Sequence, residues 1–173
     1  MSDSLVLSST SPDETRGLGE RLGALLEPGD VVLLSGELGA GKTVFVQGIA
    51  RGLGFEGSVS SKSFVLLGEY VGRVKLYHAD LYRLEDPEQV AELALDEISA
   101  DGVLVVEWPE RAGEGVLPEE HLRIEFEATG ESSRVLRVSA EGQRGQDVVE
   151  VLLANGSDDG RKDSSRVVAE GGS

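Results

Sequence analysis

One eight-residue stretch, Gly36-Glu37-Leu38-Gly39-Ala40-Gly41-Lys42-Thr43, constrains this chain more than any other part of it. It reads as a glycine, four further residues and then Gly-Lys-Thr, which is the spacing of a phosphate-binding loop. An all-apolar run over residues 31–34 precedes it and predicts a strand buried on both faces. A stripe of apolar residues over 43–53 follows it and predicts a helix that ends at Gly52 and Gly54. Strand, glycine loop and helix together indicate a P-loop rather than a glycine-rich turn that matches by chance.

The residue types in this loop suit phosphate groups. Glycines let the backbone curl so that successive N–H groups point inward toward an anion, and the N-terminus of the following helix adds partial positive charge. The Lys42 side chain is expected to neutralise the β- and γ-phosphates of a nucleotide, and the Thr43 hydroxyl to bind Mg²⁺. By itself, the loop predicts only that the phosphates of a nucleotide bind here.

Length and charge limit the remaining classes of protein. The 173 residues suffice for one domain that buries about 70% of its unfolded surface. No apolar run approaches the roughly 20 residues that span a bilayer, the N-terminus lacks a signal-peptide pattern, and the absence of cysteine fits a cytoplasmic protein. The formal net charge of −16 argues against strong direct binding to nucleic acid, whose phosphates would be repelled. In a nucleic-acid pathway, this chain is therefore expected to bind another protein.

The apolar patterns predict a compact α/β fold, P-loop NTPase-like, with a mixed sheet and parallel core strands. Before the loop we expect a strand at 5–7 and a helix that Ser11 caps, with Pro12 in its first turn and Glu14 completing a capping box. Pro28-Gly29 ends that helix.

After the loop helix comes a polar segment, 54–63, that contains Val59-Ser60-Ser61-Lys62-Ser63. It is either a plain connection or a segment that senses the γ-phosphate. A β-hairpin is expected next, with strands at 64–67 and 74–78 joined by 68–72.

The rest of the chain predicts further elements of both kinds. The expected elements are a helix from Asp86 to about Ile98, a buried strand at 103–107, an antiparallel hairpin at 122–127 and 134–140, and a helix at 147–154. We expect one P-loop domain over residues 1–154 and a disordered tail over residues 155–173.

Two carboxylates follow predicted strands and could complete a magnesium site. A P-loop needs a second ligand for its metal, usually an acid at the end of a neighbouring buried strand. Glu107 ends the strand at 103–107, and Asp80 follows the strand at 74–78. Each has a plainer interpretation: Glu107 as a surface acid beginning a turn, and Asp80 as a turn-initiating residue. The P-loop favours Glu107 as a ligand, while Asp80 stays open; one acid could bind the metal and the other orient the attacking water.

Two aromatic residues lie next to these acids. His78 is expected to be structural rather than a base, because hydrolysis of a phosphoanhydride depends more on positioning than on proton abstraction. Trp108, the only tryptophan, either stacks at a site or interface or anchors the core.

Taken together, four stretches resemble the bacterial TsaE family, the ATPase component of tRNA threonylcarbamoyladenosine biosynthesis. They are the glycine loop, Gln47–Gly54, His78-Ala79-Asp80-Leu81-Tyr82-Arg83 and Glu107-Trp108-Pro109-Glu110. The resemblance covers about residues 5 to 140, with the motifs in the same order. A P-loop alone is generic, but its combination with the two later motifs is specific.

The resemblance implies slow, Mg²⁺-dependent ATP hydrolysis by the domain over 1–154, in the cytoplasm, with the TsaD and TsaB subunits as partners and tRNA reached only through them. It implies Lys42, Asp80 and Glu107 as catalytic residues, with Thr43 and Glu107 as the metal ligands. It implies the following nucleotide-binding residues: Glu37, Leu38, Gly39, Ala40, Gly41, Lys42, Thr43, Ser63, Asp80 and Arg134.

The chain departs from the family pattern at two places. Lys62 replaces the usual proline of the switch segment and Ser63 the usual threonine, so a hydroxyl is kept while the fixed φ of proline is lost. Glu131 stands where many members carry a basic residue, which leaves Arg134 as the nearer candidate for a nucleotide contact. Lys62 is hypothesised to add a phosphate contact of its own.

Two other functions compete with this interpretation. A small-molecule kinase begins with the same loop but needs arginines in a lid, and the glycine-rich, acidic stretch directly after Glu107 supplies only Arg111. A nucleotide-gated binding module, in which hydrolysis is incidental, is the third class.

Overall fold

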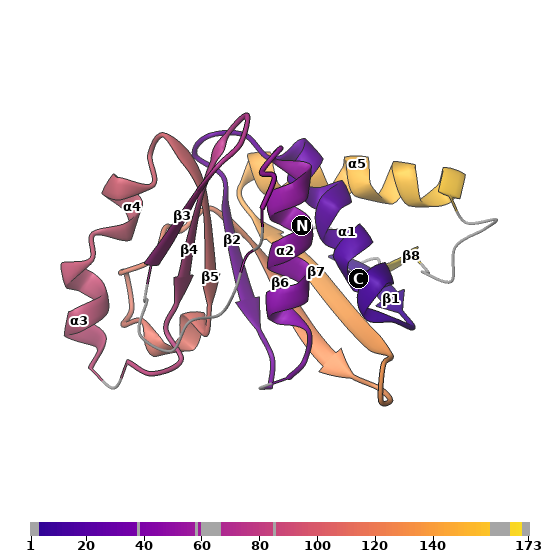
Figure 1. The fold of residues 1–173 in the computed structure, drawn as a ribbon, viewed down its shortest axis with the longest axis horizontal. Coiled ribbons are helices and arrows are strands. Elements are labelled where there is room, and N and C mark those ends of the chain that lie inside the picture. Colours follow the sequence, from indigo (N-terminus) through magenta and orange to yellow (C-terminus); the bar gives the residue numbers. More distant parts are fainter. Residues whose placement is uncertain are drawn as a thin grey trace.

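The computed structural model describes residues 4–37, 39–57, 59, 67–84, 86–159 and 167–170. Strands and helices alternate along most of this length (Figure 1). In chain order they are β1 (Ser4–Ser9), α1 (Pro12–Leu25), β2 (Val31–Ser35), α2 (Lys42–Gly52), β3 (Leu67–Val71), β4 (Lys75–Asp80), α3 (Pro87–Glu92), α4 (Leu95–Ile98), β5 (Gly102–Glu107), the 3₁₀ turn η1 (Pro109–Arg111), β6 (His121–Ala128), β7 (Arg134–Glu141), α5 (Gln143–Asp159) and β8 (Val167–Glu170).

The described strands form one mixed sheet in the order β3-β4-β5-β2-β6-β7-β1-β8. The four central strands β4, β5, β2 and β6 are parallel to one another. Antiparallel pairing adds β3 at one edge and β7, β1 and β8 toward the other. The predicted α/β class, the parallel core, the hairpin before residue 80 and the C-terminal hairpin are confirmed.

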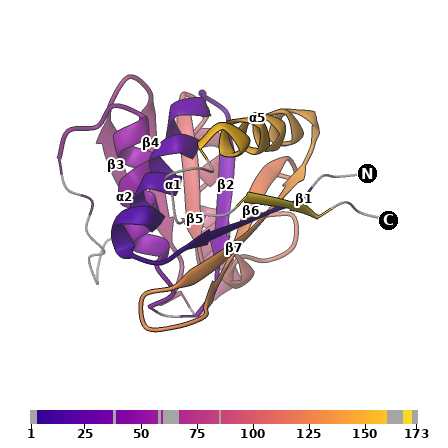
Figure 2. The same ribbon diagram turned by 90° about the vertical axis from the view of Figure 1, so that its right-hand side faces the viewer.

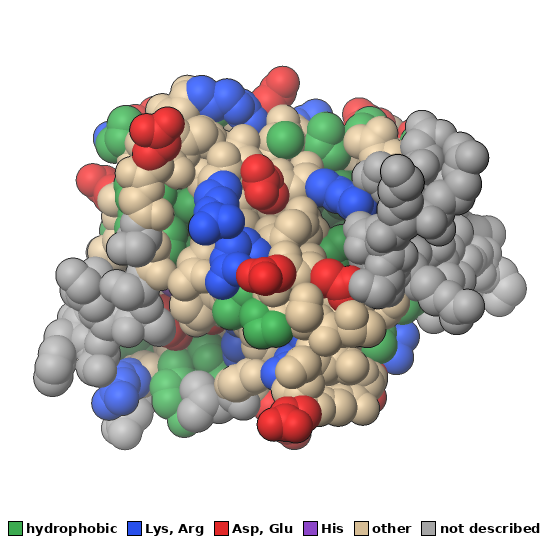
Figure 3. Space-filling view, turned by 45° about the vertical axis from the view of Figure 1, so that its right-hand side comes forward, with side chains coloured by type: hydrophobic (Ala, Val, Ile, Leu, Met, Phe, Trp, Pro, Cys, Tyr) green, Lys and Arg blue, Asp and Glu red, His purple; other side chains and the backbone are tan. Residues whose placement is uncertain are grey.

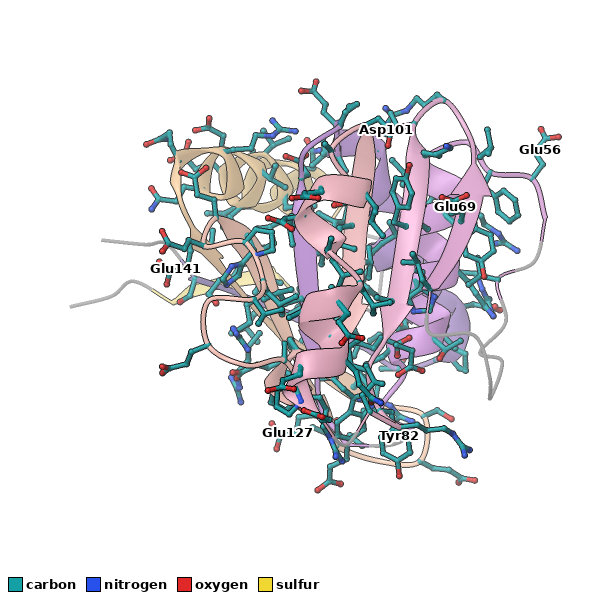
Figure 4. All side chains as sticks on the ribbon, turned by 90° about the vertical axis from the view of Figure 1, so that its left-hand side faces the viewer. Glu56, Glu69, Tyr82, Asp101, Glu127 and Glu141 are labelled. Atoms are coloured by element: carbon teal, nitrogen blue, oxygen red, sulfur yellow. The ribbon has the colours of Figure 1, made fainter. Side chains whose placement is uncertain are left out.

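Helices cover both faces of the central strands. The β2 side chains show why its sequence is apolar throughout, since alternate residues of a strand point to opposite faces. Val32 and Leu34 pack in a cluster with α1 and α2, whereas Val31 and Leu33 pack in a second cluster with α3 and α4. Figure 4 shows α3 and α4 in front of the strands and α2 behind them. The end of β2, and with it the glycine loop, is thereby fixed from both sides.

Helices α1 and α2 approach each other through glycines. A Cβ built at Gly48 would lie 2.0 Å from the carbonyl oxygen of Arg16, and one at Gly23 would lie 2.3 Å from that of Ile49. Gly19 and Gly52 make the same kind of backbone contact. The two helices therefore pack backbone to backbone, which ties α2, the helix that begins at the glycine loop, firmly to α1.

The start of α1 follows the prediction except for one hydrogen bond. The Ser11 side chain accepts from the N–H of Glu14 at 3.1 Å, so Ser11 is the N-cap. The Glu14 carboxylate, however, accepts from the N–H of Thr10 at 2.7 Å rather than from that of Ser11. The capping box is thus displaced by one residue.

Three predicted elements differ from the structure. The hairpin strand expected at 64–67 is β3, Leu67–Val71, so most of the predicted turn at 68–72 is strand; residues 64–66 lie outside the described residues. The single helix expected over 86–98 is two helices, α3 and α4, separated at Ala94, whose φ of 47° lies in the left-handed region. The last helix, α5, extends beyond 147–154 at both ends.

Parts of the expected disordered tail also have regular backbone structure. The helix α5 continues to Asp159, and β8 pairs antiparallel with β1, beside which it lies in Figure 2. The division of the chain at residue 154 stays a prediction. No helix in the described part of the chain is both long and apolar enough to cross a membrane. Figure 3 shows acidic and basic side chains interspersed over one face of the molecule.

Candidate functional site

The glycine loop connects the end of β2 to the start of α2, as predicted. Gly36 has a φ of 143°, and a Cβ there would lie 2.8 Å from the carbonyl oxygen of Phe126 in β6. Gly41 has a φ of 100° and is the N-cap of α2, with no side-chain capping bond. At both positions a side chain would be strained, because L-residues avoid this region of φ. The loop conformation therefore depends on glycine at its two ends.

Lys42 is the central side chain of the site. It is 4% exposed, and its Nζ donates to the carbonyl oxygen of Gly36 at 2.5 Å. The same Nζ lies 3.7 Å from the centroid of the Trp108 ring, an arrangement in which the electron-rich face of the indole attracts the cation. Burial lowers the pKa of Lys42 below 10.5, and the negative charges of Glu107, Glu110 and Asp80 act in the opposite direction. A buried ammonium group is thus held at the loop.

Both candidate carboxylates lie at the same end of the sheet as the loop. Asp80 and Glu107 are the last residues of the parallel neighbours β4 and β5, and they are paired in register. Glu107 is 3% exposed, and Asp80 is half-buried and accepts from the N–H of Tyr82 at 3.1 Å. Asp80 thus begins a turn, as its plainer interpretation had it, while its charge also acts on Lys42. The structure brings Lys42, Asp80 and Glu107 together.

His78 has a partner that the sequence did not reveal. Its Nε2 lies 2.5 Å from Oε2 of Glu107, and both side chains are buried. His78 precedes Asp80 by two residues in β4, so the two side chains point to the same face of the sheet. His78 is structural in the sense that it holds the side chain of Glu107, the candidate metal ligand. The two-residue spacing of His78 and Asp80 indicates only that the two side chains share a face of the sheet, and it does not identify Glu107 as the partner of His78.

Aromatic rings line the same end of the sheet. Trp108 is half-buried, with a φ of 61°, and its ring lies 4.8 Å from that of Tyr82. The Tyr82 ring has a second neighbour, the guanidinium of Arg111, which lies 6.0 Å from it. Figure 4 places Tyr82 at the lower end of the sheet, opposite the end that carries Asp101. Trp108 therefore belongs to the candidate site rather than to the core alone.

The remaining predicted residues are placed as follows. Thr43 is half-buried in the first turn of α2, Glu37 and Gly39 are exposed on the loop, and Ala40 is buried. Arg134, at the start of β7, donates to the loop carbonyls of Ala40 and Gly39. Leu38, Lys62 and Ser63 lie outside the described residues.

Gln47 is a residue that the sequence reasoning did not assign. Its Nε2 donates to the carbonyl oxygen of Val59 at 3.0 Å, and its Oε1 accepts from Nε and Nη2 of Arg16, both at 3.3 Å. Gln47 thereby connects α1 and α2 to Val59, where the predicted switch segment begins. Only its place in the family pattern marked it in the sequence.

The donors at this site are oxygen atoms, which magnesium prefers. Among the described residues there is no group of three or more His, Cys, Asp or Glu side chains that could hold a metal by themselves. One hydroxyl and one carboxylate instead suit an ion that keeps several waters and shares phosphate oxygens, as Mg²⁺ does. The residues present fit that ion in combination with a nucleotide.

Comparisons with known proteins match most of the chain to one family. A family model described as "Threonylcarbamoyl adenosine biosynthesis protein TsaE" matches residues 9–136. The chain is 40% identical over 146 residues to the tRNA threonylcarbamoyladenosine biosynthesis protein TsaE of Bacillus subtilis, covering 83% of this chain and 90% of that protein. It is 41% identical over 132 residues to the protein of the same name from Treponema pallidum, covering 76% and 97%.

A solved structure shows the same fold. The crystal structure of YdiB from Bacillus subtilis superposes with a TM-score of 0.75 at 36% sequence identity, over 90% of this chain and 97% of that one. The family model covers well over half of the chain, and the relatives are matched over nearly their whole length. This chain belongs to the TsaE family.

Proposed function

We propose that this chain binds ATP with Mg²⁺ at the glycine loop and hydrolyses it slowly, as a component of tRNA threonylcarbamoyladenosine biosynthesis that acts with the TsaD and TsaB subunits. The relatives are named for that pathway. The observation that carries the nucleotide part is Lys42, an ammonium group that is 4% exposed beside a loop of glycines at a helix N-terminus. Such a group gains most from a ligand that brings negative charge.

Each residue then has a defined role. The loop N–H groups and Lys42 bind the phosphates and orient them. Thr43 and Glu107 would hold Mg²⁺, which when bound neutralises charge on the phosphate oxygens. Asp80 orients the attacking water, since its carboxylate lies beside Glu107 in register and is more accessible. His78 fixes the Glu107 carboxylate through the hydrogen bond at 2.5 Å.

The partner is proposed to be protein rather than RNA. A net charge of −16 opposes binding to a polyanion and favours a basic partner surface. We further propose that the chain acts in the cytoplasm, together with the tRNA-modifying subunits. Hydrolysis is proposed to be slow in the isolated chain and faster with the partners, and tRNA is reached only through them.

Calorimetric titration with Mg·ATP tests the site, with two lysine variants as a matched pair. Lys42→Ala should abolish measurable binding. Lys75→Ala is the control, because Lys75 also lies over an aromatic ring, 5.6 Å from Tyr77, but begins β4 at the opposite end of the sheet. Equal loss in both variants, or unchanged binding in Lys42→Ala, would show that the loop is not the site.

A second experiment tests the partners and the reaction. The chain is used to capture TsaD and TsaB with and without ATP, and ATPase rates are measured for each mixture. We expect little turnover alone and stimulation by the partners, with Asp80→Asn retaining Mg·ATP binding but losing turnover. Phosphoryl transfer to a small metabolite without capture of a partner would instead establish a kinase. Full support of tRNA modification by Asp80→Asn would establish a nucleotide-gated binding module.

A further inference from the structure

Arg134 contacts the glycine loop from outside the predicted phosphate site. Its Nε donates to the carbonyl oxygen of Ala40 at 3.1 Å, and its Nη2 donates to that of Gly39 at 3.3 Å. These bonds join residues that are 94 and 95 positions apart in the chain. The loop carbonyls are therefore held by a side chain of the C-terminal hairpin.

The guanidinium of Arg134 is also held by the turn that precedes β7. Nη1 of Arg134 donates to the carbonyl oxygens of Ser133 at 2.8 Å and Gly130 at 3.1 Å, in the turn between β6 and β7. That turn is closed by a hydrogen bond from the N–H of Thr129 to the carbonyl oxygen of Ser133 at 3.0 Å. The guanidinium thus bridges two backbone segments, and its donors are directed at carbonyl oxygens.

We propose that Arg134 is a positioning residue that holds the glycine loop in its phosphate-binding conformation by fixing the carbonyls of Gly39 and Ala40. In a trans peptide the C=O and N–H groups point in opposite directions. A donor that fixes the Ala40 carbonyl therefore also directs the N–H of Gly41 to the opposite side of the loop. An anion nest needs this arrangement, with N–H groups inward and carbonyls outward.

The neighbouring peptide supports the same conformation. The N–H of Ala40 donates to the carbonyl oxygen of Glu37 at 3.1 Å, which closes the turn of the loop. A Cβ built on Gly41 would lie 3.7 Å from Nε of Arg134, so the arginine side chain lies next to this position of the loop. The turn bond sets one peptide plane, and Arg134 sets the next.

This inference rests on the proposed function, and it differs from the expectation that Arg134 contacts the nucleotide itself. A contact to the base or ribose matters only for ligands that contain them. A residue that shapes the nest matters for every ligand with phosphates, including inorganic tripolyphosphate. The two roles can therefore be separated by the choice of ligand.

The test compares Arg134→Ala with the wild-type chain by calorimetric titration with ATP, ADP and inorganic tripolyphosphate. We expect affinity for all three to fall by similar factors of roughly tenfold or more, the equivalent of one good hydrogen bond. Arg137→Ala is the matched control, because Arg137 lies three residues further along β7 and pairs with Glu127 at 3.3 Å on the exposed side. A loss confined to the nucleotides, or no loss, would overturn the proposal.

The conservative variant separates geometry from charge. Arg134→Lys keeps one positive charge but lacks the planar fork that reaches the loop and the turn at once. We expect Arg134→Lys to bind tripolyphosphate nearly as weakly as Arg134→Ala. Wild-type affinity in Arg134→Lys would show that charge alone suffices and would overturn the positioning role.

Hydrogen exchange of the ligand-free chain provides a readout that needs no ligand. Arg134→Ala should raise exchange in peptides that cover residues 36–45 and leave the melting temperature and exchange in α1 close to wild type. Unchanged exchange in the loop would contradict the proposal. If the wild-type chain bound neither ATP nor tripolyphosphate, the proposed function would fail, while exchange would still decide whether Arg134 holds the loop.

Discussion

His78 and Glu107 form a buried pair across two parallel strands, with Nε2 of the histidine 2.5 Å from Oε2 of the glutamate. His78 lies in the interior of β4, and Glu107 is the last residue of β5. Their exposed fractions are 6% and 3%, so neither side chain can replace its partner with bulk water. The pair therefore links the stability of the sheet to the position of a candidate metal ligand.

Replacing His78 should destabilise the fold through Glu107. His78→Ala is expected to lower the free energy of unfolding by about 1–3 kcal/mol, because a buried carboxylate loses its hydrogen bond. The effects of His78→Ala and Glu107→Ala should not add in the double variant, as measured by urea unfolding. His121→Ala is the control, since half-buried His121 donates to the carbonyl oxygen of Pro118 at 2.9 Å rather than to a buried carboxylate and should cost less. Additive effects at His78 and Glu107 would mean that the pair is not coupled.

Glycine at position 48 is required by packing rather than by backbone conformation. Gly48→Ala should lower the free energy of unfolding by about 1–3 kcal/mol, because the new Cβ forces α1 and α2 apart. Gly17→Ala is the control: Gly17 is also within a helix, and a Cβ there meets no atom within 4 Å. It should raise stability by about 0.5–1 kcal/mol through helix propensity. Thermal unfolding of both variants checks the prediction, which fails if they shift in the same direction.

The break between α3 and α4 is a strained position. Ala94 has φ 47° and ψ 51°, a left-handed conformation that costs an alanine about 1–2 kcal/mol. Ala94→Gly should therefore stabilise the chain by about 0.5–1 kcal/mol after the added freedom of the unfolded state is subtracted. Ala91→Gly, within α3, should instead destabilise it by about 1 kcal/mol. Urea unfolding distinguishes the two, and a loss of stability in Ala94→Gly would contradict the assigned break.

Much of the site followed from the sequence because parallel strands end at one edge of a sheet. Asp80 and Glu107 each follow an apolar run, and the glycine loop follows a third, so their convergence was predictable. The break at Ala94 was not, because alanine favours helix locally. It is fixed by burial of Val90 and Leu95 in one cluster, which is a tertiary effect.

Long-range hydrogen bonds were also beyond prediction from one sequence. The bond from Arg134 to Ala40 joins residues 94 positions apart, and local patterns carry no information on such a pair. The capping pattern predicts that the Glu14 carboxylate accepts from the N–H of Ser11, whereas in the structure it accepts from that of Thr10. Strand β8 is a short segment between polar residues, a pattern that predicts disorder. In the structure it is ordered by pairing with β1, which lies far from it in the sequence.

Lys42 is predicted to reduce the stability of the ligand-free chain. Because burial lowers its pKa below 10.5, the folded chain binds fewer protons than the unfolded chain between the lowered pKa and 10.5. Stability therefore rises with pH across that window, and below it the cost of burying the charge is fully present. Lys42→Met removes this cost, so it should raise the melting temperature near pH 7 while abolishing phosphate binding.

The difference in stability between Lys42→Met and the wild-type chain should depend on pH. The stability gain of Lys42→Met over wild type, measured by urea unfolding, should be largest below the lowered pKa and shrink as pH rises toward 10.5. Lys75 is the control, because its hydrogen bond with Tyr77 raises its pKa above 10.5. Any contribution of Lys75 is therefore constant below pH 10.5 and is lost only above it, so Lys75→Met should show a flat difference across the window. A difference for Lys42→Met that is equally flat would mean that the ammonium group is not desolvated at the loop.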